Sequence, residues 1–346
     1  MDPQYLAHTL LQWYDTNGRD LPWRYTRDPY AIWLSEVILQ QTRIAQGTAY
    51  WQRFMERWPN VEQLAAASED EVLKLWQGLG YYSRARNLHA AARQIVALGQ
   101  FPDTVEAIRR LKGVGDYTAA AIASLAFGIE AAAVDGNVYR VLSRVYGIAT
   151  PINSTEGKKE FQQMANLMAR GQDAGRLNQA IMDFGALQCT PKAPLCMTCP
   201  LAESCEALRQ GLTVSLPVKT KTTKVVTRRF SYVYLRCNGS TALRQRGAGD
   251  IWQGLWEPML IEPENEQGQA PLPDGARLLA QGVKHVLTHR IIMADFYLLE
   301  TNTPPPLPAD YQWVSEDDLD RYAVPRLVEL LLEAVARHDA GRAPET

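Results

Sequence analysis

Four of the five cysteines fall within one short segment, and closely spaced thiolates are common metal ligands. They are Cys189, Cys196, Cys199 and Cys205, which form a C-x6-C-x2-C-x5-C array. Four thiolates suit either a 4Fe-4S cluster or a tetrahedral zinc ion. Structural zinc sites usually present two close cysteine pairs, whereas this array has one, so the spacing favours iron and sulfur. The remaining alternative, four unligated cysteines, is unusual in a Pro-rich loop.

Two carboxylates lie in settings that suit opposite protonation states. Glu36 falls in the apolar run 33–39, where an inward-facing carboxyl would have a raised pKa and could serve as a general acid. Facing outward, it would only mark the polar side of a helix. Asp135 directly precedes a helical pattern at 138–146, where it could cap the helix and stay ionised. An acid and an anion of this kind suit cleavage of a glycosidic bond.

A glycine-rich turn lies between two helical patterns at 104–110 and 116–127. Its residues Gly113, Val114 and Gly115 allow a sharp turn and a close approach to another chain. Backbone N–H groups at the following helix start could then bind a phosphate oxygen, as in a helix-hairpin-helix. Taken alone, the turn fits an ordinary helix connection equally well.

The elements that must position these residues fall into two regions of the 346-residue chain. Helical periodicity covers residues 1–211, with capping-box spacing at Ser68/Glu71 and Asp103/Glu106. A segment rich in Lys, Thr and Val follows and indicates a linker. Beyond it the pattern predicts an α+β domain. Its expected strands are residues 230–237, 241–245, 284–289 and 291–300, with a helix at 324–337.

Charge is distributed unevenly although the net charge is only −2. The helical region is balanced, the linker is basic, and the C-terminal region is acidic. Any contact with nucleic acid therefore requires a local basic patch. The longest apolar tract, at 119–129, is too short to span a bilayer, and the first residues lack a secretory pattern. We expect a soluble protein that does not associate with membranes.

Several separated segments resemble the MutY-type adenine DNA glycosylases of the endonuclease III-like superfamily. They are residues 21–24 (LPWR), 34–42 (LSEVILQQT), 78–88 (GLGYYSRARNL) and 134–138 (VDGNV), and the cysteine array has the family's spacing. The order of hairpin and then Asp135 is also that of the superfamily. The resemblance implies a mainly α helix-hairpin-helix glycosylase domain with a 4Fe-4S loop over 1–211, a linker over 212–227, and a C-terminal α+β Nudix-like domain over 228–346.

The resemblance also implies roles for residues of the first domain. Glu36 would protonate adenine as a leaving group and then help to activate water, and Asp135 with Asn137 would stabilise the developing positive charge on the sugar. Arg24 would line the adenine pocket. Gln41 and Tyr81 would wedge into the duplex beside the extruded base.

Tyr117 occupies the position at which bifunctional endonuclease III-like enzymes carry a nucleophilic lysine. Without that amine no Schiff base can form there, so the resemblance implies a monofunctional glycosylase. Lys112 is near enough in sequence to supply an amine instead.

In the second domain, residues 243–246 and 251–258 resemble the family's Nudix-like domain. A hydrolytic Nudix helix needs glutamates in an R-E-x-x-E-E arrangement to bind magnesium. No such arrangement occurs between residues 260 and 284, so this domain should recognise rather than hydrolyse. Thr288 and His289 correspond to the family's loop for reading 8-oxoguanine, with Leu287 in place of an aromatic residue. An ordinary strand end is the alternative.

We therefore expect a base-excision repair enzyme that hydrolyses the N-glycosidic bond of adenine opposite 8-oxoguanine or guanine. Its partner would be double-stranded DNA, and the protein would be a cytoplasmic, nucleoid-associated monomer with a 4Fe-4S cluster. The alternatives are an endonuclease III-like glycosylase and lyase for damaged pyrimidines, and a non-catalytic iron-sulfur protein that binds DNA.

Overall fold

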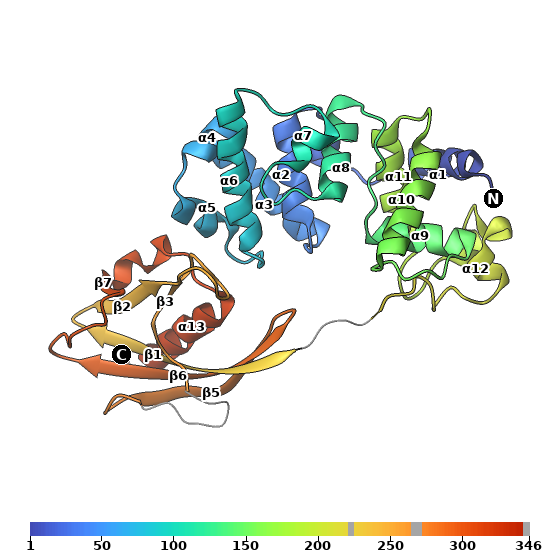
Figure 1. The fold of residues 1–346 in the computed structure, drawn as a ribbon. Helices are drawn as coiled ribbons and strands as arrows, with labels where there is room; N and C mark the ends of the chain where they lie inside the picture. Colours follow the sequence, from blue (N-terminus) through green and yellow to red (C-terminus); the bar gives the residue numbers. More distant parts are fainter. Residues whose placement is uncertain (221–224, 264–271, 342–346) are drawn as a thin grey trace. The chain divides into compact units, whose positions relative to one another are not determined.

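The computed structural model describes residues 1–220, 225–263 and 272–341 (Figure 1). Contacts divide the chain into two compact units. Unit 1 comprises Met1–Ala66 and Asn87–Lys221, and unit 2 comprises Ala67–Arg86 and Thr222–Thr346. The division places a short helical segment with the C-terminal strands, which the sequence pattern alone did not suggest. No helix within the described ranges combines the length and apolarity needed to cross a membrane.

Unit 1 is helical, as the periodicity predicts. Its elements are α1 (Pro3–Asn17), η1 (Pro22–Arg24), α2 (Pro29–Leu39), α3 (Ile44–Arg57), α4 (Val61–Ala66), most of α6 (Ser83–Leu98), α7 (Val105–Arg109), α8 (Asp116–Phe127), α9 (Gly136–Tyr146), α10 (Thr155–Ala169), α11 (Ala174–Leu187), η2 (Cys196–Thr198), η3 (Ala202–Ser204) and α12 (Glu206–Arg209). Apolar faces of α1, α9, α10 and α11 form one core, which includes Leu10, Leu142, Phe161 and Phe184. Burial of these faces holds α9 and α11 side by side.

Helix starts follow the capping chemistry of the sequence, with one correction. Ser68 and Glu71 form the expected capping box at the start of α5 (Glu69–Trp76), which lies in unit 2. The cap of α7 is Thr104 rather than Asp103, because the Thr104 hydroxyl accepts a hydrogen bond from the N–H of Ala107 at 3.2 Å. Threonine and aspartate are both good caps, so adjacent candidates cannot be separated by residue type alone.

The turn between α7 and α8 has the geometry that its glycines allow. Gly113 has φ of 77°, and a Cβ atom there would lie 2.7 Å from Cβ of Asn87. Val114 is buried and donates its N–H to the carbonyl of Leu111 at 3.1 Å. Gly115 is the N-cap of α8 and is exposed. The exposed backbone on either side of Val114 is therefore the part of the hairpin that can approach a second molecule.

The segment after α12 was expected to be a linker, and its first part packs on unit 1. Leu216 is buried and accepts a hydrogen bond from Arg144 at 3.1 Å, and the carbonyl of Val218 accepts one from the N–H of Ile152 at 3.0 Å. Lys221 and Lys224, two of the basic residues of this segment, lie outside the described residues.

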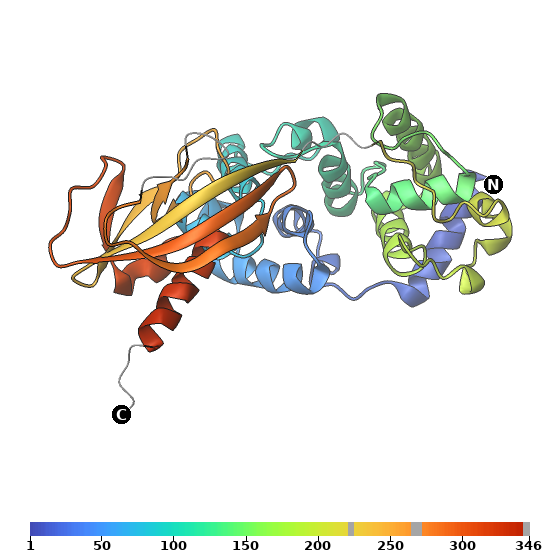
Figure 2. The same cartoon turned by 90° about the horizontal axis from the view of Figure 1, so that it is seen from below.

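Unit 2 is built on one mixed sheet covered by a helix (Figures 1 and 2). Its strands are β1 (Val226–Cys237), β2 (Ser240–Gln245), β3 (Trp256–Glu257), β4 (Met259–Ile261), β5 (Arg277–Val286), β6 (Arg290–Thr301) and β7 (Tyr311–Ser315), followed by η4 (Glu316–Arg321) and α13 (Arg326–Ala340). The strand order is β3-β2-β1-β6-β5, with β4 on β1 and β7 on β2. The pair β1 and β6 is parallel, and the other pairs are antiparallel. The apolar face of α13 packs on Phe230, Tyr232 and Phe296.

One expected strand ends earlier than its pattern suggested. β5 stops at Val286, so Thr288 and His289 lie in the turn that joins β5 to β6, and not within a strand. The N–H of Leu287 closes this turn on the carbonyl of Arg290 at 2.8 Å, and the Leu287 side chain packs on the core of unit 2. No Gly, Pro, Asn or Asp occurs between residues 284 and 292, so the sequence carries no residue typical of a turn there, which explains the error.

Candidate active site

A cavity of about 420 Å³ within unit 1 gathers residues from five segments of the chain. This volume lies within the usual range for ligand pockets. Arg24, Glu36, Gln41, Tyr117, Asp135 and Asn137, which the sequence singled out, all line it. They come from η1, α2, the turn after α2, α8 and the start of α9. Glu36 and Asp135, which lie 99 residues apart, therefore face the same space.

Glu36 faces inward from α2. The helix is buried on nearly all sides, and the side chain of Glu36 is only 9% exposed. Burial raises the pKa of Glu36 to about 7, and the charge of Asp135 adds to this effect. A hydrogen bond from Tyr117 and the positive charge of Arg24 act in the opposite direction. A carboxyl with this pKa can give up and regain a proton near neutral pH.

Tyr117 projects from the first turn of α8 beside this carboxyl. Its hydroxyl is a hydrogen-bond partner of Glu36 and lies 3.3 Å from the sulfur of Met182. Burial raises the pKa of Tyr117 well above its usual value, and the charges of Glu36 and Asp135 add to this. The phenol therefore keeps its proton and acts as a donor.

Asp135 caps α9 while its carboxylate faces the cavity. Oδ1 accepts the N–H groups of Asn137 and Val138, both at 2.8 Å, and Oδ2 accepts the side-chain amide of Asn137 at 2.7 Å. Capping and a role in the cavity are thus compatible. The three donors and the positive end of the helix dipole favour a negative charge at this position.

Two arginines of α9 connect this end of the cavity to the cysteine loop. Arg140 donates to Oδ1 of Asn137 and to the carbonyl of Cys189, both at 2.7 Å. Arg144 donates to the carbonyl of Thr190 at 2.7 Å and lies 3.4 Å from Sγ of Cys189. α11 can approach Asn137 closely because Gly185 has no side chain, since a Cβ there would lie 2.7 Å from that of Asn137.

An ion-pair cluster that sequence reasoning missed holds Arg24 in the cavity wall. Asp183 of α11 is fully buried and binds both terminal nitrogens of Arg24, at 2.7 and 2.8 Å. The same carboxylate binds the side chain of Arg19 and its N–H, the latter at 2.9 Å. A single aspartate within the apolar pattern of α11 was the only signal in the sequence. Gln179, one turn earlier, lines the same cavity.

Gln41 and Tyr81 share an unusual backbone conformation, each within its own unit. Their φ angles are 57° and 47°, in the left-handed region that residues with side chains seldom adopt. Both side chains are exposed, Tyr81 by 51%. Such strained positions are concentrated at functional sites.

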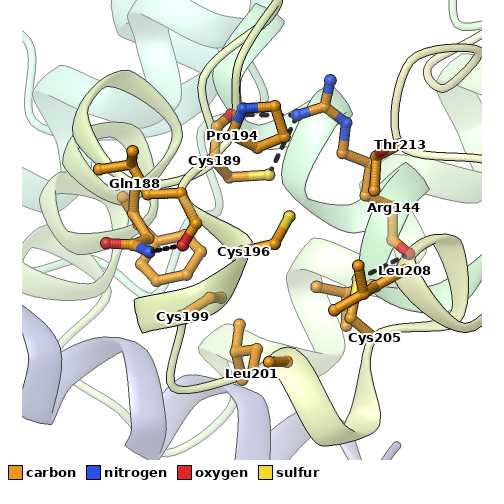
Figure 3. Close-up of a pocket in the computed structure, with 14 residues that line it drawn as sticks. Arg144, Gln188, Cys189, Pro194, Cys196, Cys199, Leu201, Cys205, Leu208 and Thr213 are labelled. Carbon is orange, nitrogen blue, oxygen red and sulfur yellow. Dashed lines mark hydrogen bonds between the residues drawn. The ribbon is translucent and has the colours of Figure 1, made fainter.

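The four clustered cysteines line a separate, small cavity at the end of unit 1 (Figure 3). Cys189 follows α11, Cys196 begins η2, Cys199 follows η2, and Cys205 precedes α12. All four are half-buried and lie around one space, with Arg144 at its edge. In the described ranges no group of three or more His, Cys, Asp and Glu side chains has the arrangement of a single-ion site. Four thiols around a shared hollow nevertheless match the donor set of a 4Fe-4S cluster.

A second large cavity, of about 640 Å³, lies within unit 2. Tyr81, Trp252, Thr288 and His289 line it. The hydroxyls of Tyr81 and Thr288 lie 2.9 Å apart and share a hydrogen bond. Thr288 and His289 are thus at the edge of a pocket lined by aromatic rings, which suits a flat ligand.

Comparison with protein families agrees with the two-part architecture. Residues 34–166 match the family model of the HhH-GPD superfamily base excision DNA repair proteins. Residues 231–334 match the NUDIX domain model. The mainly α helix-hairpin-helix domain and the C-terminal Nudix-like domain expected from the sequence are confirmed.

Similar proteins include adenine DNA glycosylases. The one from Buchnera aphidicola subsp. Schizaphis graminum is 34% identical over 253 residues, which cover 72% of this chain and 73% of that protein. The one from Homo sapiens is 46% identical over 210 residues, which cover 58% of this chain and 38% of that protein. The chain spans less than half the length of the mammalian relatives it matches.

Among solved structures, a thermostable thymine-DNA glycosylase is similar with a TM-score of 0.56 and 32% identity. The match covers 60% of this chain and 97% of that one. The helical fold therefore also occurs in a glycosylase named for a different base, so the fold by itself does not specify a base.

Proposed function

Because the chain belongs to the adenine DNA glycosylase family, we propose that it hydrolyses the N-glycosidic bond of adenine in double-stranded DNA. One observation carries the proposal beyond family membership. Glu36, with a pKa of about 7, and Asp135, held by backbone N–H groups, line the same cavity. The first can supply a proton to a base, and the second can stabilise positive charge on a sugar.

The proposed reaction needs one proton and one water molecule. The Glu36 carboxyl donates its proton to a ring nitrogen of the extruded adenine, and the bond between that base and C1′ breaks. The Asp135 carboxylate stabilises the positive charge that develops on the sugar. Water then adds its oxygen to C1′ and returns a proton to Glu36. Adenine leaves neutral, and an abasic sugar with a hydroxyl remains.

The chain's own residues support a monofunctional reaction. A lyase needs an uncharged amine beside C1′ to form a Schiff base. Tyr117 lies in the cavity in place of such a group, and its raised pKa keeps the hydroxyl protonated. It can orient Glu36, but its protonated hydroxyl is a poor nucleophile.

We further infer that the mispair is adenine opposite 8-oxoguanine or guanine. Supporting this are the Thr288 hydroxyl and the His289 imidazole at the edge of the cavity of unit 2, where they can hydrogen-bond the edge of a base. The exposed, left-handed positions of Gln41 and Tyr81 suit side chains that enter a base stack. The exposed backbone at Gly113 and Gly115 suits a phosphate contact.

We also infer a 4Fe-4S cluster held by Cys189, Cys196, Cys199 and Cys205. When bound, the cluster would supply iron–thiolate bonds that cross-link the loop, and the hydrolysis needs no redox step from it. Analysis of the purified protein for iron, sulfide and zinc tests this inference. Iron and sulfide in about equal amounts, four of each per chain, would support it. One zinc per chain without iron would overturn it.

A single assay tests the activity. The protein is incubated with duplexes that carry adenine opposite 8-oxoguanine, guanine or thymine, and alkali then cleaves abasic sites. Strand breaks at adenine in the first two duplexes are expected, together with their loss in Glu36→Gln. Two further variants show whether loss of activity is specific to the cavity. Asn137→Ser changes a second residue that lines the cavity, whereas Glu56→Gln changes a glutamate at the surface of α3. Absence of breaks in every duplex would refute the proposal.

A further inference from the structure

Asp250, between β2 and β3, is bound by three arginine side chains from separate segments. Arg228 of β1 and Arg290 of β6 both donate to its Oδ1, at 2.6 and 2.7 Å. Arg246 donates to its Oδ2 at 2.6 Å. Burial acts to raise the pKa of Asp250, but hydrogen bonds from Arg228, the Ile251 N–H and Arg290 outweigh it and hold this pKa far below its usual value. The carboxylate is therefore an ionised junction between strands.

Arg290 connects this junction to the turn that presents Thr288 and His289. Its carbonyl accepts the N–H of Leu287 at 2.8 Å and so closes the turn. The carbonyl of His289 accepts the N–H of Val226 at 3.1 Å. These bonds set the backbone of the turn, and the bond to Asp250 holds the Arg290 side chain beside β1. The turn is thereby closed on itself and tied to β1 and to Asp250.

The same carboxylate also orders a second segment that lines the cavity. Arg246, which binds Asp250, donates from Nε to the carbonyl of Ile251 at 2.9 Å. The next residue, Trp252, has φ of 58°, and its ring lies 5.7 Å from that of His285. A tryptophan in the left-handed region persists only where its surroundings hold it. Asp250 is therefore the common anchor of two segments that line the cavity.

We propose that Asp250 is a positioning residue for reading the base opposite the adenine, acting through Arg290 on the turn at Thr288 and His289 and through Arg246 on Trp252. This inference rests on the proposed function. Recognition of a base edge requires hydrogen-bond donors held to within about half an ångström of their positions. Loss of either linkage should therefore reduce the selectivity for the opposite base more than it reduces the rate of bond cleavage. The reacting groups lie in a different cavity, in unit 1.

The test is the ratio of two single-turnover rates measured on the full chain, with adenine opposite 8-oxoguanine and opposite guanine. Asp250→Asn keeps the shape of the side chain but removes its charge and turns one acceptor into a donor. We expect this variant to lower the ratio about tenfold, as for loss of a charge-assisted hydrogen bond at a partly exposed site. The rate opposite guanine should change by less than about twofold, because that rate does not depend on the lesion contacts.

Two further variants keep the test decisive. Arg290→Gln should also lower the ratio, but by less than Asp250→Asn, because it breaks only the linkage to the turn and leaves the bond between Arg246 and Asp250 intact. The double variant should lower the ratio no further than Asp250→Asn alone, because Asp250→Asn already breaks the linkage through Arg290. Glu262→Gln is the matched control, since Glu262 also binds Arg228, at 2.8 Å, and its loss should leave the ratio unchanged. If Asp250→Asn does not fold, as judged by circular dichroism, Arg290→Gln alone decides the outcome.

An unchanged ratio in the folded variants, or an equal fall in both rates, would overturn the inference. A similar fall in the ratio for Glu262→Gln would overturn it as well, since the effect would then follow any lost carboxylate in this network. Failure of the proposed function looks different: the unaltered chain would release adenine from none of the duplexes.

Discussion

Replacing Glu36 with glutamine should abolish base release and, at the same time, stabilise the folded protein above neutral pH. The pKa of this carboxyl rises from a usual value of 4.5 to about 7, chiefly because it is buried. Since one pKa unit is worth about 1.4 kcal/mol, ionising Glu36 within the cavity costs about 3 kcal/mol of stability. Glutamine has nearly the same shape, still accepts a hydrogen bond from Tyr117, and carries no charge.

The sign of the effect depends on pH. Below pH 4.5 the carboxyl is protonated in the folded and unfolded states alike, so the substitution does not change stability through ionisation. Between pH 4.5 and about 7 the unfolded chain loses its proton first, and the free energy of unfolding of the wild type falls. Above this window the full difference of about 3 kcal/mol persists. The advantage of Glu36→Gln should therefore grow with pH and then level off.

Urea unfolding followed by far-ultraviolet circular dichroism measures this difference, because unit 1 supplies most of the helical signal. Wild type, Glu36→Gln and the exposed control Glu56→Gln are compared from about pH 5 to about pH 8. Glu56→Gln should follow the wild type throughout. If Glu36→Gln shows the same pH dependence as the wild type, the carboxyl does not carry a raised pKa. Retained base release by Glu36→Gln would refute its role as the acid.

Three other results are expected. The single-turnover rate of the wild type should fall as pH rises through about 7, because Glu36 loses the proton that it must donate; a flat profile would contradict this. Tyr117→Lys should form a covalent DNA adduct on borohydride reduction, because the new amine can form a Schiff base, whereas the wild type should form none. Adduct formation by the wild type would indicate another amine, such as Lys112. Asp183→Asn should lower the free energy of unfolding by about 3 kcal/mol, since it leaves buried arginine charge unpaired. It should also slow adenine release, because Arg24 is no longer held in the cavity wall by the carboxylate. A stable, fully active variant would argue against a role of Asp183 in positioning Arg24.

Features governed by neighbours along the chain could be predicted from the sequence. The cap at Asp135 is an example, because its hydrogen bonds reach only two and three residues ahead. The cysteine array is another, since all four thiols come from one short loop. Even here residue type left small errors, as between Asp103 and Thr104, where two adjacent side chains suit the same task.

The cavity depended on contacts between distant segments. The apolar run around Glu36 allowed either an inward or an outward side chain, and only the packing of α2 decided that it faces inward beside Tyr117 and Asp135. Asp183 binds Arg24 across 159 positions of sequence, and no spacing rule connects two residues so far apart. Arg24 lies in the segment 21–24 that carries the resemblance, but Asp183 belongs to none of the motifs found in the sequence.

The amino-acid sequence by itself determined that residues 1–211 are mainly helical, where some of the helices begin, which loop can hold a metal cluster and which residues are able to carry a proton or a charge. Tertiary structure alone decided the raised pKa of Glu36, the ion pair between Arg24 and Asp183, and the binding of three arginines by Asp250. The physical reason is that capping and turn formation depend on bonds between neighbours in the chain. Desolvation and ion pairing depend on whichever groups folding brings together, and those groups can come from any part of the sequence.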